Sequence, residues 1–147
     1  MTALQQILDA YRNNSQTERE KGTYFEELIV TYFRHEATYA DLYSKVWLFS
    51  DWAKAHPEFN ISAKDTGVDL VALTSGSNEY HAIQCKCYAE DYKLQKKDID
   101  SFFTASGQKP FAHRIIVATT NEWSDNAEAS LFNQQPPVSK IDLHDLE

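Results

Sequence analysis

Three polar residues occur where a strand pair would be expected to build part of a hydrophobic core. Asp69 is the second residue of the apolar run VDLVALT, and Gln84 and Lys86 lie two positions apart in the following run, YHAIQCKCY. Side chains two positions apart on a strand project to the same face, so Gln84 and Lys86 are expected to share one. If the hairpin pairs Asp69 near Lys86, the three groups converge at one end of the sheet.

These residue types together suit one kind of chemistry. A carboxylate and an amide oxygen at such a place can hold a hard divalent ion, for which Mg²⁺ is the common choice. A lysine beside that ion can orient or deprotonate a water, or offset charge developing on a phosphate. Glu26, at the edge of a predicted helical stripe, is a candidate for one more oxygen ligand. Hydrolysis of a phosphodiester bond needs these parts.

The same residues also have a purely structural interpretation. An Asp at a strand start after a glycine often bonds within a turn, and a Gln and a Lys can face solvent from a half-exposed sheet. Spacing alone favours this interpretation, because the pattern D-x(14)-Q-x-K fixes few positions. The flanking residues favour the functional one, since Ile83, Cys85 and Cys87 fill one face of the strand with apolar side chains.

Composition indicates a single folded domain. The chain has 147 residues, of which 42% are hydrophobic and 13% aromatic, enough for one compact core. Its formal net charge of -8 argues against a basic nucleic-acid binder. A local basic cluster argues the other way, and it consists of Lys86, Lys93, Lys96 and Lys97. Charge alone therefore does not decide the question.

Targeting signals and membrane spans are not expected. No apolar run approaches the roughly 18–20 residues that a membrane span requires, and the start MTALQQILDAYRNN lacks the features of a signal peptide. Cys85 and Cys87 lie two apart on one predicted strand, a poor geometry for a disulfide. A reducing, cytoplasmic location is the resulting expectation.

Periodicity predicts an alternation of helices and strands. Helical spacing of apolar residues predicts helices within 4–11, 25–33, 94–108 and 124–132, with a short helix near 39–43. Strands are predicted at 68–74, 80–88, 114–120 and 138–146, segment 46–52 can be strand or helix, and 56–67 is a loop. This order predicts an α/β fold in which helices flank a central mixed β-sheet. A helical part is expected over about 1–45 and an α/β core over about 46–147. The last predicted strand has no closing helix after it, as expected of a fragment of a longer polypeptide.

The segment GVDLVALTSGSNEYHAIQCKCY is similar to the core of the PD-(D/E)xK nuclease superfamily, and in particular to Mrr-like restriction endonucleases. In those proteins a D-x-G-x-D-hydrophobic strand pairs with a (Q/E)-x-K strand. Here the corresponding residues are Asp65-Thr66-Gly67-Val68-Asp69 and Gln84-Cys85-Lys86. An upstream helix with Gly22, Phe25 and Glu26, and a basic helix that follows, complete the pattern. The resemblance covers roughly residues 20–120 and implies a restriction-endonuclease-like fold.

The succession KGTYFEELIVTYF…DTGVDLVA…IQCKCY also resembles the N-terminal nuclease domain of Type ISP restriction–modification enzymes. These are single polypeptides in which a helicase-like ATPase, a methyltransferase and a target-recognition domain follow the nuclease. The resemblance implies double-stranded DNA as a partner, the downstream domains as further partners, and ATP as a cofactor through those domains only. A second nuclease copy is a possible partner for cleavage of both strands.

The resemblance also implies roles for individual residues. Asp69, Gln84 and the backbone carbonyl of Cys85 would bind Mg²⁺, for which Mn²⁺ can substitute, Lys86 would be the catalytic lysine and Glu26 an auxiliary acid. Gln84 departs from the carboxylate usual in the superfamily, which should weaken metal affinity, although Mrr-like members share it. Lys93, Lys96 and Lys97 are candidate DNA contacts, and a solvated helix face is the alternative. Asp65 matches the pattern, and capping of a turn is its alternative role.

The leading hypothesis is a Mg²⁺-dependent DNA endonuclease domain without sequence specificity of its own, since no base-reading element is recognisable. With a net charge of -8, the isolated chain is expected to bind DNA weakly and to cleave poorly unless tethered. Two alternatives remain. One is a Holliday-junction resolvase or repair nuclease of the same fold, which the acidic charge disfavours. The other is a catalytically inactive assembly module, which the presence of Asp69, Gln84 and Lys86 disfavours.

Overall fold

A five-stranded mixed sheet forms the centre of the protein, seen here in a computed structural model that describes residues 3–14, 17–62 and 67–146. Its strands follow one another in chain order: β1 (Tyr43–Leu48), β2 (Leu70–Thr74), β3 (Tyr80–Lys86), β4 (Phe111–Ala118) and β5 (Val138–Ile141). The strands β1, β2 and β3 pair antiparallel, whereas β3, β4 and β5 pair parallel. The predicted mixed sheet is therefore confirmed.

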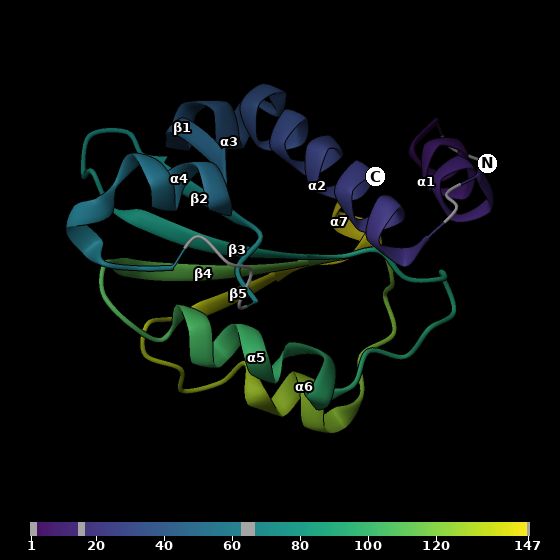
Figure 1. Ribbon diagram of the computed structural model, residues 1–147. Coiled ribbons are helices and arrows are strands. Elements are labelled where there is room, and N and C mark those ends of the chain that lie inside the picture. Colours follow the sequence, from purple (N-terminus) through teal and green to yellow (C-terminus); the bar gives the residue numbers. More distant parts are fainter. Residues whose placement is uncertain (1–2, 15–16, 63–66, 147) are drawn as a thin grey trace.

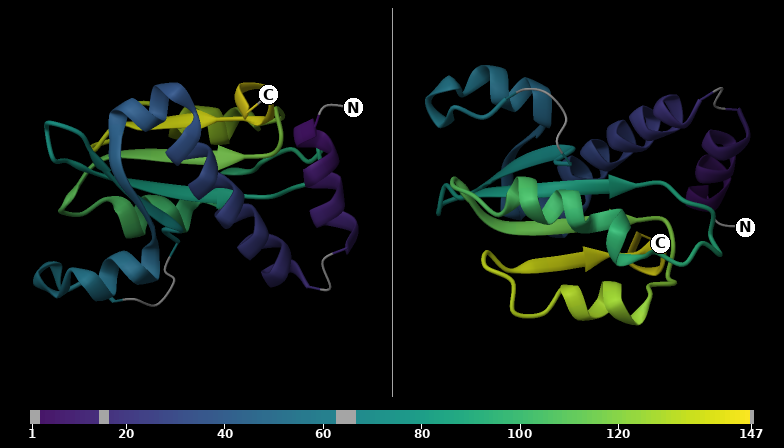
Figure 2. Two further views of the ribbon diagram at one scale, coloured as in Figure 1. Left: turned by 90° about the horizontal axis from the view of Figure 1, so that it is seen from above. Right: turned by 60° about the horizontal axis from the view of Figure 1, so that its bottom comes forward.

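Helices cover both faces of this sheet. They are α1 (Ala3–Asn14), α2 (Glu18–His35), α3 (Ala37–Leu42), α4 (Phe49–Ala55), the 3-10 turn Pro57–Phe59, α5 (Lys96–Ser106), α6 (Asp125–Ser130) and α7 (Leu143–Leu146). Figure 1 shows α2 and α7 on one side of the sheet and α5 and α6 on the other. The views in Figure 2 place α1 and α7 near the same end of the sheet. Helices on both faces are the arrangement expected of an α/β fold.

Each face of the sheet has its own apolar core. On the α2 side, Phe25, Ile29 and Phe33 of the predicted helical stripe are buried against the sheet. On the other side, α5 contributes Ile99 and Phe102 to a second core. Residues 115–118 of β4 are buried and alternate between the two cores. This confirms the prediction that this β-branched strand is covered on both faces.

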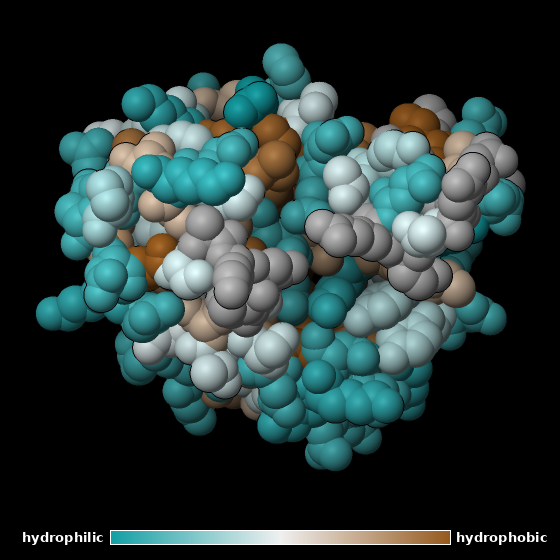
Figure 3. Space-filling view, in the orientation of Figure 1, coloured by the Kyte–Doolittle hydropathy of each residue, from teal (hydrophilic) through white to brown (hydrophobic). Residues whose placement is uncertain are grey.

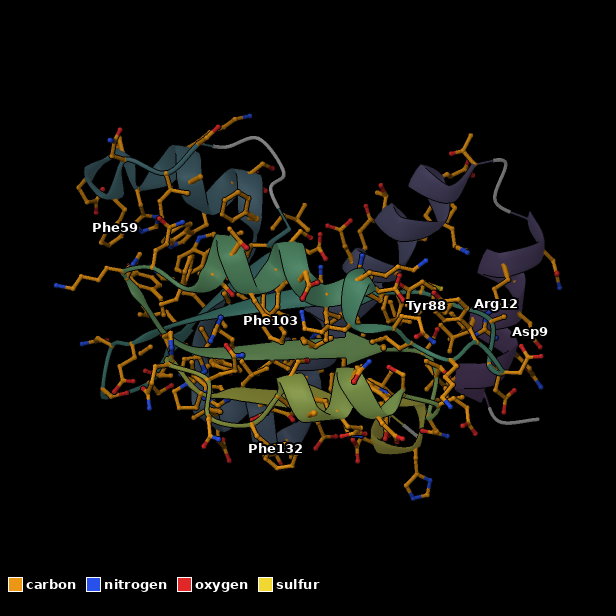
Figure 4. The ribbon with its side chains drawn as sticks, turned by 90° about the horizontal axis from the view of Figure 1, so that it is seen from below. Asp9, Arg12, Phe59, Tyr88, Phe103 and Phe132 are labelled. Carbon is orange, nitrogen blue, oxygen red and sulfur yellow. The ribbon has the colours of Figure 1, made fainter. Side chains whose placement is uncertain are left out.

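An aromatic cluster closes one end of the molecule. Trp52 of α4 is fully buried and stacks on Phe59, with ring centroids 5.5 Å apart and an interplanar angle of 13°. The edge strand β1 continues directly into α4, so segment 46–52, predicted as strand or helix, contains the end of one and the start of the other. Figure 4 places Phe59 at one end of the molecule, and Tyr88, Asp9 and Arg12 at the other.

The C-terminal prediction is partly wrong. The predicted strand 138–146 ends at Ile141, and Leu143–Leu146 form the short helix α7. The cause is a reciprocal pair of hydrogen bonds. The Asp142 N–H donates to Asp145 Oδ2 at 3.1 Å, and the Asp145 N–H donates to Asp142 Oδ1 at 3.0 Å. Such mutual capping satisfies amides that would otherwise lack partners at a helix start, and it stops the strand.

The hairpin register decides what Asp69 meets. Leu70 lies opposite Ile83 in the β2–β3 pair, so Asp69 falls at the end of the ladder. The side chain of Asp69 contacts the backbone of Cys85, one residue before Lys86, rather than pairing with Lys86 itself. Asp69, Gln84 and Lys86 are nevertheless brought to one end of the hairpin, as the sequence predicts.

Candidate active site

A pocket of about 820 Å³ opens where β2 begins and β3 ends, between the first turns of α2 and the start of α4. Hydrophilic residues lie in the hollow between α4 and α2 in the space-filling view, with hydrophobic atoms at part of its rim (Figure 3). Its walls combine residues from five separate segments of the chain: Gly22, Thr23, Glu26, Glu27, Leu48, Phe49, Ser50, Gly67, Val68, Asp69, Gln84, Cys85, Lys86 and Ser101. All four residues predicted to be catalytic are among them.

Asp69 is held on both sides by the sheet. Its N–H donates to the carbonyl of Ile83 at 2.9 Å, and its carbonyl accepts from the N–H of Phe49 at 2.9 Å. The carboxylate oxygen Oδ2 accepts the N–H of Cys85 at 2.7 Å. A hydrogen bond from a backbone N–H to a carboxylate is a strong, directional contact, so it orients the Asp69 side chain in the pocket.

The backbone of β3 alternates between its two neighbouring strands. The carbonyl of Ile83 and the N–H of Cys85 face Asp69. The carbonyl of Lys86 points the other way and accepts a hydrogen bond from the N–H of Thr119, the residue after β4, at 3.1 Å. On an extended strand the N–H and C=O of one residue point the same way. The carbonyl of Cys85 therefore points toward the side of the strand where Asp69 lies, as a metal ligand would need to.

Gln84 is the buried polar residue of the pocket, with 2% of its surface exposed. Its Nε2 donates to the carbonyl of Gly67 at 3.3 Å, and its Oε1 is buried without any hydrogen-bond partner. An unsatisfied buried oxygen is costly unless a ligand or ion completes it. Together with the Asp69 carboxylate and the Cys85 carbonyl, this oxygen fits the all-oxygen coordination that Mg²⁺ prefers.

The candidate metal ligands of this pocket are not only acidic and imidazole side chains. Within residues 3–14, 17–62 and 67–146, no group of three or more His, Cys, Asp or Glu side chains is placed to hold a metal ion. A metal here would thus depend on amide and backbone oxygens, which Gln84 and Cys85 supply.

Glu26 and Lys86 approach the pocket from different elements. Lys86 is half-buried and shares the face of β3 that carries Gln84. Glu26 is half-buried on α2, whose orientation is fixed by the burial of the neighbouring Phe25. The pKa of the Cys85 thiol is raised well above its usual value, first by burial and then by the negative charges of Asp69 and Glu26. The carboxylates of Asp69 and Glu26 therefore both lie close enough to Cys85 to affect its ionisation.

The predicted DNA contacts lie outside the pocket. Lys93, Lys96 and Lys97 are exposed, and Lys96 forms an ion pair with Asp100, with 2.8 Å between Nζ and Oδ1. Lys97 precedes the pocket residue Ser101 by four positions on α5, so the two share a helix face. Asp65 lies outside the described residues.

Sequence reasoning gave no role to several wall residues, of which Gly67 is the most constrained. Gly67 has a φ of +118°, and a Cβ built there would lie 3.0 Å from the backbone carbon and oxygen of Ser101. The signal was present in the motif, which includes this glycine. The contact with Ser101 has no local signature, because the two residues lie far apart in the chain.

The chain is similar to known restriction endonucleases. Residues 34–147 match the family model of an Mrr-type catalytic domain described as a restriction endonuclease. Among curated proteins, no match was found. The solved structure of an "ATP-dependent Type ISP restriction-modification enzyme LlaBIII bound to DNA" matches with a TM-score of 0.71 and 30% identity. That match covers 95% of this chain and 8% of LlaBIII.

A second solved structure, "MspJI Restriction Endonuclease in Complex with 27-mer Oligonucleotide", matches with a TM-score of 0.43 and 15% identity. It covers 92% of this chain and 32% of MspJI. The match to LlaBIII confirms the restriction-endonuclease-like fold predicted from the sequence. Among the helices of the described residues, none is long and apolar enough to cross a membrane.

Proposed function

The chain belongs to the Mrr-like restriction endonuclease family, and on this premise we propose that it is a metal-dependent nuclease domain that hydrolyses phosphodiester bonds in DNA. Asp69, Gln84 and the backbone carbonyl of Cys85 bind Mg²⁺ or, in its place, Mn²⁺. The observation that carries the proposal is the buried, unpartnered Oε1 of Gln84 in the pocket that Asp69 and Lys86 also line.

The side chains divide the chemistry among themselves. When bound, the metal supplies a Lewis acid that polarises a phosphoryl oxygen and acidifies a water. Asp69 is held in place by the Cys85 N–H and contributes the negative charge of the site. Lys86, two positions after Gln84, stabilises charge developing on the phosphate and positions the attacking water. Glu26, on the opposite wall, is an auxiliary acidic residue whose carboxylate can act as a base and accept a proton from that water.

The setting of this reaction is a larger enzyme. The chain spans 8% of LlaBIII, an enzyme that is described as ATP-dependent and whose structure was solved bound to DNA. We propose that this nuclease likewise acts on double-stranded DNA beside ATPase, methyltransferase and target-recognition domains of one polypeptide. The nuclease itself has no sequence specificity, and a second copy cuts the other strand. With a net charge of -8, the isolated chain depends on tethering to reach DNA.

Nicking of a supercoiled plasmid by the full-length parent enzyme tests this proposal. With Mg²⁺, Asp69→Ala and Lys86→Ala are each expected to lower the cleavage rate by at least about 100-fold, because each removes charge stabilisation from the transition state. Lys54→Ala, on an exposed position of α4, is the matched control and should cleave as the wild type does. If both pocket variants cut as fast as the control, the assignment of the site is wrong.

A further inference from the structure

A single hydrogen bond orients the amide of Gln84. An amide side chain can present either its oxygen or its nitrogen to a metal, and only the oxygen is a useful ligand. In the pocket, Nε2 donates to the carbonyl of Gly67 at 3.3 Å, which leaves Oε1 as the end without a protein partner. The carbonyl of Gly67 is therefore what distinguishes the two orientations.

Gly67 can make this contact only because it has no side chain. Its φ of +118° lies in a region that residues with a Cβ rarely adopt. A Cβ at this position would also lie 3.0 Å from Ser101 C and O and 3.1 Å from Phe102 N, all in the backbone of α5. Backbone atoms of a packed helix cannot yield as a flexible side chain would. The backbone at Gly67 thus packs directly against α5. This close approach fixes the position of the Gly67 carbonyl relative to the Gln84 amide.

The same contact explains why position 84 is an amide. A glutamate in this position would bring a second carboxylate beside Asp69 and should strengthen the attraction of a cation. It would also lack the N–H that the Gly67 carbonyl accepts, and would place an oxygen 3.3 Å from that carbonyl oxygen. The repulsion would turn the carboxylate away from the position that Oε1 now holds.

We infer that Gly67 is the positioning residue of this site: its carbonyl, set by the contact with α5, aims Gln84 Oε1 into the pocket and makes an amide the suitable side chain there. This inference rests on the proposed function, because it assigns Gln84 Oε1 to a divalent cation. It goes beyond that function in naming a residue that acts on the metal through another side chain.

The closing experiment compares two glycines in the 147-residue chain. Gly76, in the β2–β3 turn, also has a positive φ, +78°, but no atom lies within 4 Å of a Cβ built there. Gly67→Ala and Gly76→Ala both place a Cβ on a residue with a positive φ, and only the first Cβ also meets α5. We expect Gly67→Ala to bind Mg²⁺ about 10- to 100-fold more weakly than Gly76→Ala by titration calorimetry, as is typical when the partner of a metal ligand is removed.

Two further readouts test the inference, and the second does not depend on the folding of Gly67→Ala. In metal-free protein, the side-chain NH₂ resonances of Gln84 should shift in Gly67→Ala and stay unchanged in Gly76→Ala. Gln84→Glu, which keeps Gly67, should bind Mg²⁺ no more tightly than the wild type despite its extra charge. Unchanged Gln84 resonances in Gly67→Ala, or a tenfold or larger gain in affinity in Gln84→Glu, would overturn the inference.

The two proposals fail in different ways. If the wild type binds Mg²⁺ and Gly67→Ala binds it as tightly as Gly76→Ala, the positioning role is wrong and the metal site stands. If the wild type and all variants bind no divalent cation, the metal site is wrong, and the positioning role is overturned with it.

Discussion

Strand β3 carries two buried polar side chains whose hydrogen bonding differs sharply. His81, with 9% of its surface exposed, pairs its Nδ1 with the Tyr43 hydroxyl at 2.7 Å. Gln84, only three residues later, has a single 3.3 Å bond from Nε2 and a buried oxygen with no partner. Buried polar groups in stable proteins are nearly always satisfied. The satisfied residue belongs to the architecture, and the unsatisfied oxygen of Gln84 is the one that we propose a metal ion completes.

The surroundings of His81 and the pocket around Gln84 also differ in charge. The pKa of His81 is lowered to about 4, chiefly by burial and then by His113, so the imidazole region stays neutral near pH 7. At the other end, the carboxylates of Asp69 and Glu26 raise the pKa of the Cys85 thiol in addition to the effect of burial. One region thus excludes charge, whereas the other concentrates negative charge that a cation can offset.

The largest expected effect is on function, in a variant of the unsatisfied residue. Gln84→Met keeps the side-chain length and removes the unpaired Oε1. The rate of cleavage by the full-length parent should therefore fall by at least about 100-fold. The free energy of unfolding in EDTA should change by no more than about 1 kcal/mol, because removal of the unpaired oxygen offsets the loss of the Nε2 hydrogen bond to the Gly67 carbonyl. Plasmid nicking and urea unfolding measure the two quantities. A variant that unfolds more easily yet still cleaves would break the comparison.

A variant of the satisfied region should show the opposite pattern. Tyr43→Phe leaves His81 Nδ1 buried without its partner, which should lower the free energy of unfolding by about 1–3 kcal/mol. Cleavage per folded molecule should not change, since Tyr43 lies outside the pocket. Tyr39→Phe is the control, in a ring stacked on Tyr43 at an interplanar angle of 7°, and should cost less. Equal losses in the two variants would show that the hydrogen bond is not the cause.

The depressed pKa of His81 predicts a dependence of stability on pH. The unfolded chain takes up a proton at its usual pKa of 6.5, and the folded protein only near pH 4. His81 therefore destabilises the fold progressively as the pH falls from 6.5 toward 4, and has no such effect above 6.5. Allowing for solvent screening, the loss should be about 1–2 kcal/mol. Urea unfolding between pH 7 and 5 should show a shallower fall in His81→Gln, and parallel curves would refute the assignment.

The smallest effect is expected outside both regions, on α5. If Lys97 contacts a DNA phosphate, Lys97→Met should lower the slope of log K against log salt by about 0.9. Lys96→Met, in which the lost lysine was paired with Asp100, should change the slope less. Neither variant should change the free energy of unfolding by more than about 1 kcal/mol, as is usual for exposed charges. Fluorescence anisotropy with duplex DNA over a range of salt concentrations measures the slope.

Local patterns predicted most elements correctly. The stripe that includes Phe25, Ile29 and Phe33 is buried in α2, and Gly107 follows the last residue of α5. Segment 46–52, predicted as strand or helix, supplied the end of a strand and the start of a helix. The error lies in residues 142–146, which left the predicted strand because Asp142 and Asp145 cap each other.

The sequence by itself determined which side chains could act together on one strand. Gln84 and Lys86 share a face of β3 because alternation is a property of the extended backbone, whatever surrounds it. The periodic burial of α2 likewise follows from helical geometry.

Only the tertiary structure decided what these side chains meet. The β2–β3 register brings the Asp69 carboxylate to the Cys85 N–H, and the packing of α2 brings Glu26 to the same pocket. The approach of α5 to Gly67 sets the orientation of the Gln84 amide. Each of these contacts joins residues that are distant in the chain, and their positions depend on how whole elements pack, which no local pattern encodes.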